Sequence, residues 1–174
     1  MKKQKINRLD FVVDKLTNSV ENVQTRESFK TEVTLVSKEE IKTITKKNGW
    51  LFDWESEFKA PEKEVYKLTI SGSTDIHGLI SITFRDDHIY MHLIESAPFN
   101  KGSNKKYLGV PGNLVAFACK VSYLRGGGGY VSFNSKTQLI EHYVTTLGAT
   151  HFGGTLMVMT PETSLKLIDK YFNN

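Results

Sequence analysis

The sequence predicts a mixed α/β (α+β) fold: a mostly antiparallel central sheet with helices on both faces. Three alternating runs in the middle of the chain, residues 64–71, 78–85 and 88–95, are typical of an antiparallel meander. From residue 113 the hydrophobic period becomes helical, and helical and strand-like stretches then alternate to the end. An antiparallel half that leads into a strand–helix–strand half is best accommodated by one mixed sheet.

Length and composition favour one domain. The 174 residues are 39% hydrophobic and 24% charged, which supports a packed core and argues against disorder. We predict a single domain over residues 1–174, in which residues 1–30 are an N-terminal extension that adds an edge strand or a dimer contact. A homodimer therefore stays open as an alternative.

Charge and cysteine content exclude several classes of protein. The 23 basic residues exceed the 19 acidic ones by four, an excess too mild to indicate a specific nucleic-acid partner. Cys119 is the only cysteine, so we expect no intrachain disulfide and no cysteine-rich metal site, and we assign no metal-binding residues. No apolar run approaches the roughly 18 residues of a membrane span, and charges interrupt the basic N-terminus before a signal peptide would be complete. We therefore expect a cytoplasmic protein without a membrane partner.

The elements before and within the meander follow from local patterns. Residues 29–36 alternate as a strand does, and Ser37 with Glu40 fits a capping box, which predicts a helix over residues 38–47. In the strand at 88–95, strict alternation places Glu95 with Met91 on one face of the sheet. His92 is then expected on the other face, beside Tyr90.

The second half of the chain is expected to alternate helices and strands. A glycine-rich loop over residues 100–112 precedes a helix that starts at Asn113, and a second helix over 137–147 ends at Gly148. Strands are predicted at 130–133 and 152–159. A last helix is expected to begin at Pro161 and to bury three residues, Leu165, Ile168 and Phe172.

The segment from Glu95 to Arg125 carries the chemical signal. A strand ends, a glycine loop turns, and a helix begins, so unpaired helix amides and the helix dipole create a site for a phosphate or pyrophosphate. A P-loop is excluded because Gly112 is not followed by Lys and then Ser or Thr. A Rossmann fingerprint is excluded because the loop follows an antiparallel meander. The alternative is a loop whose glycines only shape a tight turn.

From about Phe29 to Met159 the sequence resembles the GNAT superfamily of acyl-coenzyme-A-dependent N-acyltransferases. The resemblance rests on five stretches: Met91-His92-Leu93-Ile94-Glu95-Ser96, Lys106-Tyr107-Leu108-Gly109-Val110-Pro111-Gly112-Asn113-Leu114, Ala116–Ser122 with Gly126, Leu139-Ile140-Glu141-His142-Tyr143, and Leu147-Gly148-Ala149. Two departures stand out. The loop carries one residue more than the family pattern, and the family's tyrosine slot four residues before the glycine holds Val144, with Tyr143 one residue away.

The resemblance implies a GNAT-like sheet whose two middle strands splay, with the pantetheine arm of coenzyme A or acetyl-CoA lying between them. It also implies that the pyrophosphate rests on the loop and the first turn of the following helix. The cofactor-binding residues expected on this basis are Ile94, Ser96, Lys106, Tyr107, Leu108, Gly109, Val110, Gly112, Asn113 and Leu114.

The implied reaction moves an acyl group from a thioester to an amine, which requires a base and an acid. Glu95, at the end of a strand with apolar neighbours, is the expected base, against the alternative of a solvent-exposed strand-end carboxylate. His92 is a second candidate for the base. Tyr143 is the expected acid, against the alternative of a core tyrosine at helical spacing.

The stretch Trp50–Phe58 corresponds to the region that lines the acceptor site in GNAT proteins. Asp53, Trp54 and Glu55 are the expected contacts for a cationic small-molecule or peptide amine, through charge and cation–π interaction. The alternative is an amphipathic segment with its acids in water. Two other functions stay open: a catalytically inactive GNAT-fold binding or regulatory module, and an acyltransferase that acts on a protein or charged tRNA.

Overall fold

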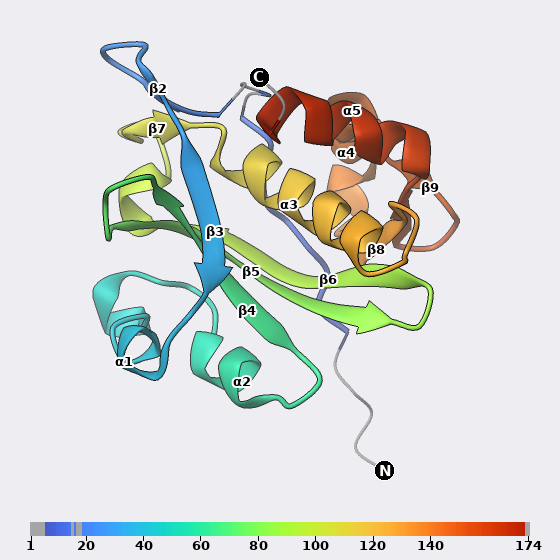
Figure 1. Cartoon of the computed structure of the whole chain (residues 1–174), viewed down its shortest axis with the longest axis horizontal. Coiled ribbons are helices and arrows are strands. Elements are labelled where there is room, and N and C mark those ends of the chain that lie inside the picture. Colours follow the sequence, from blue (N-terminus) through green and yellow to red (C-terminus); the bar gives the residue numbers. More distant parts are fainter. Residues whose placement is uncertain (1–5, 15, 17–18, 173–174) are drawn as a thin grey trace.

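In the computed structural model, the main feature is a seven-stranded mixed sheet formed by the described residues, 6–14, 16 and 19–172 (Figure 1). Its strands run in the order β3-β4-β5-β6-β8-β10-β9, and β6 and β8 are its parallel pair. This confirms the predicted mixed, mostly antiparallel sheet. The strand bounds are β3 Thr31–Leu35, β4 Glu64–Ile70, β5 Ile76–Arg85, β6 His88–Ser96, β8 Val131–Asn134, β9 Thr150–His151 and β10 Leu156–Met159.

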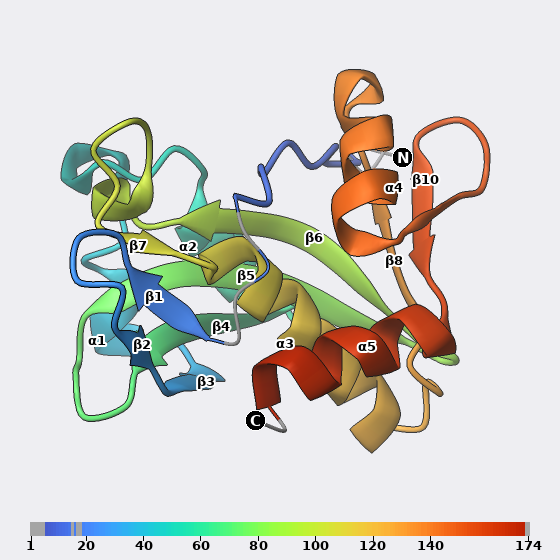
Figure 2. The ribbon, with the colours of Figure 1, turned by 90° about the horizontal axis from the view of Figure 1, so that it is seen from above.

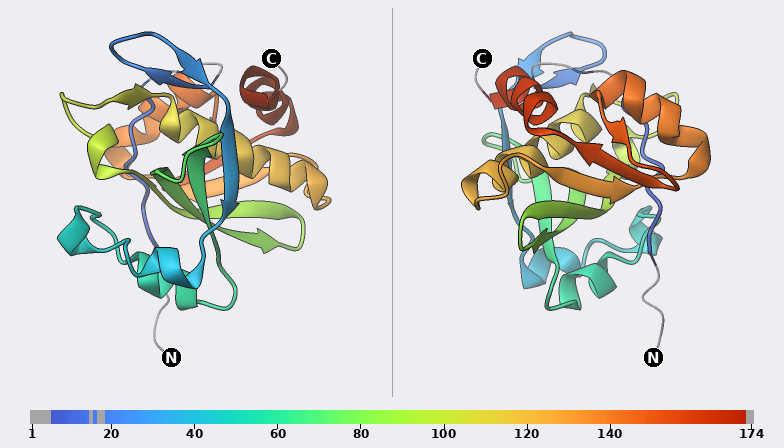
Figure 3. Two further views of the ribbon diagram at one scale, coloured as in Figure 1. Left: turned by 60° about the vertical axis from the view of Figure 1, so that its left-hand side comes forward. Right: turned by 90° about the vertical axis from the view of Figure 1, so that its right-hand side faces the viewer.

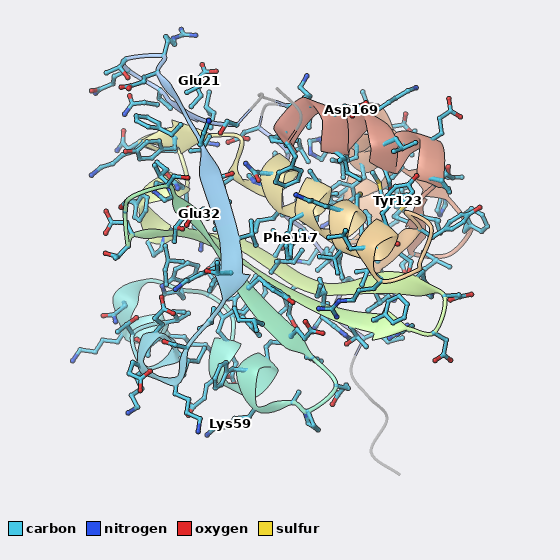
Figure 4. The ribbon with its side chains drawn as sticks, in the orientation of Figure 1. Glu21, Glu32, Lys59, Phe117, Tyr123 and Asp169 are labelled. Atoms are coloured by element: carbon cyan, nitrogen blue, oxygen red, sulfur yellow. The ribbon has the colours of Figure 1, made fainter. Side chains whose placement is uncertain are left out.

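Helices cover both faces of this sheet (Figure 3). Helices α1 (Lys38–Ile41) and α2 (Trp54–Lys59) lie on one face; α3 (Val110–Leu124), α4 (Ile140–Leu147) and α5 (Pro161–Phe172) lie on the other. Three 3-10 helices connect elements, η1 Lys46–Asn48, η2 Pro98–Asn100 and η3 Thr137–Leu139. Phe117 of α3 lies between that helix and the sheet, with its ring centroid 4.8 Å from that of Tyr66 on β4 (Figure 4).

A small sheet braces the loop that leads into α3. Strand β1 (Val20–Asn22) pairs on one side with β2 (Ser28–Phe29) and on the other with β7 (Tyr107–Leu108). The backbone N–H of Val23 also donates to Lys106 O at 2.9 Å. Residues 20–29 therefore form their own ribbon, and the edge strand of the main sheet is β3.

Strands β6 and β8 separate after a short parallel contact. Their described register pairs are Ile89 with Val131 and Tyr90 with Ser132, at the beginning of each strand. Beyond this point the two strands diverge, so the predicted splay of the middle strands is confirmed. The gap is the position at which a mixed sheet of this kind presents unpaired strand edges.

The N-terminal segment of the chain passes through this gap, between β6 and the β8–α4 unit (Figure 2). Leu9 N donates to Asn134 O at 2.7 Å, and Lys136 N donates to Leu9 O at 2.9 Å, so the segment pairs with the end of β8. The side chains of Leu9, Phe11 and Val13 are buried. Leu9, Phe11 and Val13 are thus part of the core, which the sequence did not indicate.

A β-bulge at His92 changes the expected face of Glu95. Ser81 of β5 pairs with Leu93 and Ile82 pairs with Met91, so His92 is the extra residue between them. Residues opposite each other in an antiparallel pair share a face. Because of the bulge, Glu95 lies on the face of Tyr90 and not on the face of Met91, so the expectation from strict alternation was wrong.

Several helix boundaries differ from the predicted ones for local reasons. Helix α3 begins at Val110 because Pro111 fits the first helical turn, where no N–H is needed. The capping box of Ser37 and Glu40 is confirmed, but α1 ends at Ile41 and η1 follows separately. In α5, Ser164, Leu167 and Tyr171 are buried, and the predicted inward residues Ile168 and Phe172 are half-buried against the core. Leu165 is exposed, so the prediction was wrong for this residue.

Candidate active site

A cleft of about 310 Å³ opens where β6 ends beside α3. One wall consists of Ile94, Glu95 and Ser96, and the facing wall belongs to residues 10–14 of the N-terminal segment. The segment before α2, the loop after β6 and the start of α3 complete the cleft. They contribute Leu51, Phe52, Asn100, Lys101, Gly102, Lys105 and Pro111. Of the predicted cofactor-binding residues, the structure therefore places Ile94 and Ser96 directly on a cavity.

Gly109 and Pro111 shape the N-terminal end of α3, where a phosphate is expected to bind. Gly109 adopts a φ of 91°, which favours glycine, and Pro111 contributes no N–H to a ligand. Gly109 N donates to Asp14 Oδ1 at 3.2 Å, and Lys105 Nζ lies 3.3 Å from Asp14 Oδ2. A carboxylate of the chain itself thus occupies the end of the helix where an anion is expected.

Gly112 allows close packing between two helices. A Cβ at this position would lie 2.2 Å from Tyr171 Oη on α5 and 3.1 Å from Leu16 Cδ2. Glycine at position 112 therefore allows α3 to pack closely against α5.

Five other predicted cofactor residues are used in packing or pairing. Tyr107 and Leu108 pair with β1, and the N–H of Lys106 donates to Phe99 O at 3.1 Å. Asn113 is buried and its Nδ2 donates to Thr31 Oγ1 at 3.0 Å, while Leu114 lies in the core. Among the basic residues near the loop, the cleft is lined by Lys101 and Lys105.

Glu95 is a buried carboxylate held by donors on both oxygens. Its Oε1 accepts from the indole Nε1 of Trp54 at 2.8 Å and from Phe52 N at 3.2 Å. Its Oε2 accepts from Leu51 N at 2.8 Å and forms an ion pair with Lys101. The side chain of Glu95 thus ties the segment before α2 to the end of β6.

His92 lies in the bulge on the same face as Tyr90, with its Nε2 2.7 Å from Thr83 Oγ1. Burial, with the positive charges of Lys63 and Arg85, lowers the pKa of His92 to about 4 from its ordinary 6.5. The imidazole is therefore neutral at pH 7. It borders a second cavity, lined also by Ile6 and Asn7, on the face of the sheet covered by α1 and α2.

Tyr143 on α4 is fully buried and faces the gap between the diverging strands. Its hydroxyl donates to Phe11 O at 2.6 Å, and its ring centroid lies 4.7 Å from that of Phe11 and 5.2 Å from that of Phe133. Burial raises the pKa of the Tyr143 phenol well above its usual value, and the charge of Asp10 adds to this. The phenol therefore carries its proton at neutral pH, and it becomes a better acid only where the surroundings of its hydroxyl change.

The three predicted acceptor residues lie at the start of α2. Asp53 caps the helix, accepting from Ser56 N at 3.1 Å and from Ser56 Oγ at 2.7 Å. Trp54 is fully buried against Glu95, and Glu55 is exposed in an i,i+4 ion pair with Lys59. All three border a cavity with Ile41 and Lys46. Their acceptor role stays a prediction.

The residues that sequence reasoning missed are those of the N-terminal segment. Phe11, Asp14 and their neighbours form a wall of the cleft and contact Tyr143 and Gly109. The short apolar run Phe11-Val12-Val13 was the available signal, but three residues do not reveal a long-range partner.

The described residues form no metal-binding cluster, and the thiol of Cys119 is buried. Within residues 6–14, 16 and 19–172, no group of three or more His, Cys, Asp or Glu side chains is placed to hold a metal ion. Burial raises the pKa of the Cys119 thiol to about 12. Among the helices formed by these residues, none is both long and apolar enough to cross a bilayer.

Comparison with known proteins gives matches at the level of structure. No family model and no curated protein sequence matches the chain. The fold is similar to that of spermidine N-acetyltransferase from Vibrio cholerae in complex with CoA and spermine, with a TM-score of 0.55, 10% identity, and coverage of 78% of this chain and 98% of that one. A structure of spermidine/spermine N-acetyltransferase from Vibrio cholerae with manganese ions matches at a TM-score of 0.53 and 11% identity, covering 79% of this chain and 96% of that one.

Proposed function

From the GNAT fold of this chain, we propose that it is an N-acyltransferase that moves an acetyl or other short acyl group from coenzyme A to an amine by direct attack. The observation that carries the proposal is the separation of β6 and β8 beyond Tyr90 and Ser132, with β6 leading through a loop into the N-terminus of α3. This arrangement supplies a slot for an extended arm and a positive helix end beside it. The acetyltransferases of similar fold support the same reaction class.

In this reaction the amine nitrogen attacks the thioester carbonyl, the new C–N bond forms, and the C–S bond breaks. The attacking ammonium must first lose a proton to a base, and the leaving thiolate takes one from an acid. We assign the arm of coenzyme A to the cleft beside Ile94 and Ser96, and its phosphates to the start of α3. Lys101 and Lys105 line this cleft and supply positive charge.

Tyr143 is the proposed acid, because its hydroxyl lies beside Phe11 and Phe133, in the gap between the strands. For the base, Glu95 and His92 both stay candidates. Glu95 must lose one of its hydrogen-bond donors before it can take a proton. His92 is neutral, and its Nε2 lies against the Thr83 hydroxyl, which can rotate away and leave that nitrogen able to accept a proton. Replacing each by glutamine and comparing kcat under saturating substrates separates them, since the true base loses about 100-fold or more.

Binding of coenzyme A is the first test of the proposal. A ligand that binds only the folded state stabilises it by mass action, by about 2.7 kcal/mol at roughly 100 times Kd. We therefore expect coenzyme A to raise Tm in a concentration-dependent manner, with adenosine alone as the control. The absence of a shift at millimolar coenzyme A contradicts the acyltransferase proposal.

A catalytically inactive GNAT-fold module is the second candidate function. The specific observation in its favour is Glu95, whose two oxygens are both occupied by donors from the described residues. A thiol-release assay with acetyl-CoA and a panel of amines decides between the two. The panel should include a polyamine, as in the structural neighbours, together with peptide N-termini and lysine. Binding of charged tRNA that weakens with salt would indicate a macromolecular acceptor.

A further inference from the structure

Residues 9–14 occupy the gap between β6 and β8, which is the path proposed above for the arm of coenzyme A. We propose that this gap is a binding site for an extended peptide, that residues 9–14 are its internal ligand, and that coenzyme A binds only after they leave. The inference rests on the proposed function, because it concerns the regulation of the same site.

The backbone of the segment behaves as an added strand. Leu9 exchanges hydrogen bonds with Asn134 and Lys136 at the end of β8, and Val13 N donates to His142 Nε2 of α4 at 2.9 Å. The pantetheine arm is also an extended chain with amide groups along it, so it requires the same kind of strand edge. The side chains of Leu9, Phe11 and Val13 fill the apolar space behind this edge.

The segment also engages the proposed acid. The hydroxyl of Tyr143 donates to Phe11 O at 2.6 Å, and the two rings lie at a tilt of 34° with 4.7 Å between their centroids. A phenol has one proton to donate. While the hydroxyl donates its hydrogen bond to Phe11 O, Tyr143 is unable to protonate a leaving thiolate, so catalysis requires this contact to break.

At its other end the segment presents a negative charge to the start of α3. Asp14 accepts from Gly109 N at 3.2 Å, and its second oxygen lies 3.3 Å from Lys105 Nζ. A phosphate of coenzyme A would use the same backbone donor and the same cation. Three features expected of the coenzyme, an extended backbone, an acceptor for Tyr143 and an anion on α3, therefore coincide in six consecutive residues.

Competition of this kind has a simple quantitative consequence. The apparent Kd of coenzyme A equals the intrinsic Kd divided by the fraction of molecules in which the segment has left. Loosening the segment must therefore tighten coenzyme binding, and coenzyme must release the segment. A permanent wall behaves in the opposite way, since loosening it weakens the site.

Limited trypsin digestion of the full chain tests the release directly. Arg8 is exposed, but the following residue, Leu9, is paired with β8, which protects the bond between them from the extended binding that the protease needs. We expect coenzyme A to accelerate cleavage after Arg8 severalfold and to slow cleavage after Lys120 in α3. Intact-mass spectrometry measures both rates. If coenzyme A raises Tm but slows this cleavage or leaves it unchanged, the segment stays in place and the inference is wrong while the proposed function stands.

A pair of variants tests the competition from the other side. Leu9→Ala removes a buried anchor that does not line the cleft, whereas Ile6→Ala trims an exposed residue of the same segment. We expect Leu9→Ala to lower the Kd of coenzyme A about tenfold, measured calorimetrically, and Ile6→Ala to leave it within about twofold. Leu9→Val replaces Leu9→Ala if the latter lowers Tm below the assay temperature. An equal or higher Kd for the Leu9 variant overturns the inference; failure of wild type and variant alike to bind coenzyme A overturns the proposed function as well.

Discussion

Glu95 illustrates how one buried charge organises its surroundings. Its carboxylate is 3% exposed and accepts from the backbone of Leu51 and Phe52, from the indole of Trp54 and from Lys101. A buried carboxylate is tolerated only when donors surround it, and removing the charge leaves those donors without their partner. Glu95 therefore stabilises the structure around it, whether or not it also serves as a base.

Glu95→Gln is expected to destabilise the protein by about 3 kcal/mol, because the amide turns an N–H₂ toward groups that are themselves donors. Urea unfolding monitored by tryptophan fluorescence measures this change. The matched control is Glu62→Gln, an exposed carboxylate, which should stay within about 0.5 kcal/mol of wild type. Equal stability of the two variants would show that the donors around Glu95 do not depend on its charge.

His92 predicts a dependence of stability on pH. Its pKa is about 4 in the folded protein and near 6.5 in the unfolded chain, so between these values the unfolded chain binds a proton that the folded one does not. The contribution of His92 is fully present above about pH 6.5 and is lost as the pH falls toward 4. Burial lowers the pKa of His77 as well, in the same direction.

We expect the free energy of unfolding to fall between pH 6.5 and 4, and to fall less steeply in His92→Gln. Urea titrations at half-unit pH intervals measure both slopes, and NMR titration of the imidazole gives the pKa directly. Identical slopes for wild type and His92→Gln would contradict the lowered pKa. A rise in stability on acidification would contradict the sign of the argument.

At the scale of elements, α3 is positioned by a close contact with α5. Within α3, alanine normally stabilises a helix relative to glycine by up to about 1 kcal/mol. At Gly112, however, the added methyl would lie 2.2 Å from Tyr171 Oη. Gly112→Ala is therefore expected to destabilise the protein by about 1–3 kcal/mol, because steric overlap outweighs helix propensity.

A double-mutant cycle with Tyr171→Phe tests whether this contact is the cause. Removing the hydroxyl relieves the shortest overlap and leaves the ring carbon Cζ at 3.1 Å. The double variant should therefore recover about 1 kcal/mol relative to the sum of the single changes. Urea unfolding measures the stability of each variant. If the two single changes are additive, the contact with the Tyr171 hydroxyl is not the cause of the strain in Gly112→Ala.

The elements that were predicted well are those with a strong local signal. The meander follows from alternation and the start of α1 from the capping box of Ser37 and Glu40, and both are confirmed. The bulge at His92 has no such signal, because no glycine or proline marks the extra residue, and one inserted residue reverses the face of everything after it. The face of Glu95 was therefore wrong although its strand was right.

The candidate site was predictable only in part, for a similar reason. The end of β6 and the start of α3 are continuous in sequence, so Ile94 and Ser96 were found from the motif and do line the cleft. The opposite wall comes from residues 10–14, which lie far earlier in the chain. A contact such as that between Asp14 and Gly109 depends on the tertiary fold, and no local propensity encodes it.

At the scale of the whole molecule, the sheet consists of two parts joined by a narrow contact. In the described residues β5 pairs with β6 through eight register pairs and with β4 through six, whereas β6 pairs with β8 through two. Tyr90 adds one side-chain link, its hydroxyl accepting from Asn134 Nδ2 at 2.6 Å. The part formed by β8, β9 and β10 is therefore held to the rest mainly by helix packing and by the N-terminal segment.

This division predicts two levels of protection in native-state hydrogen exchange. Regions with few strand pairs open at a lower free energy than the global one, so amides of β8 and β10 should exchange through an opening that leaves β4, β5 and β6 protected. Coenzyme A, which we place between β6 and β8, takes over the position of residues 9–14 and, well above its apparent Kd, should raise the protection of β8 more than that of β5. Exchange followed by mass spectrometry with and without coenzyme A resolves both effects. Uniform protection across the sheet would show that the two parts unfold as one unit, and equal gains in β5 and β8 would place the coenzyme away from the gap.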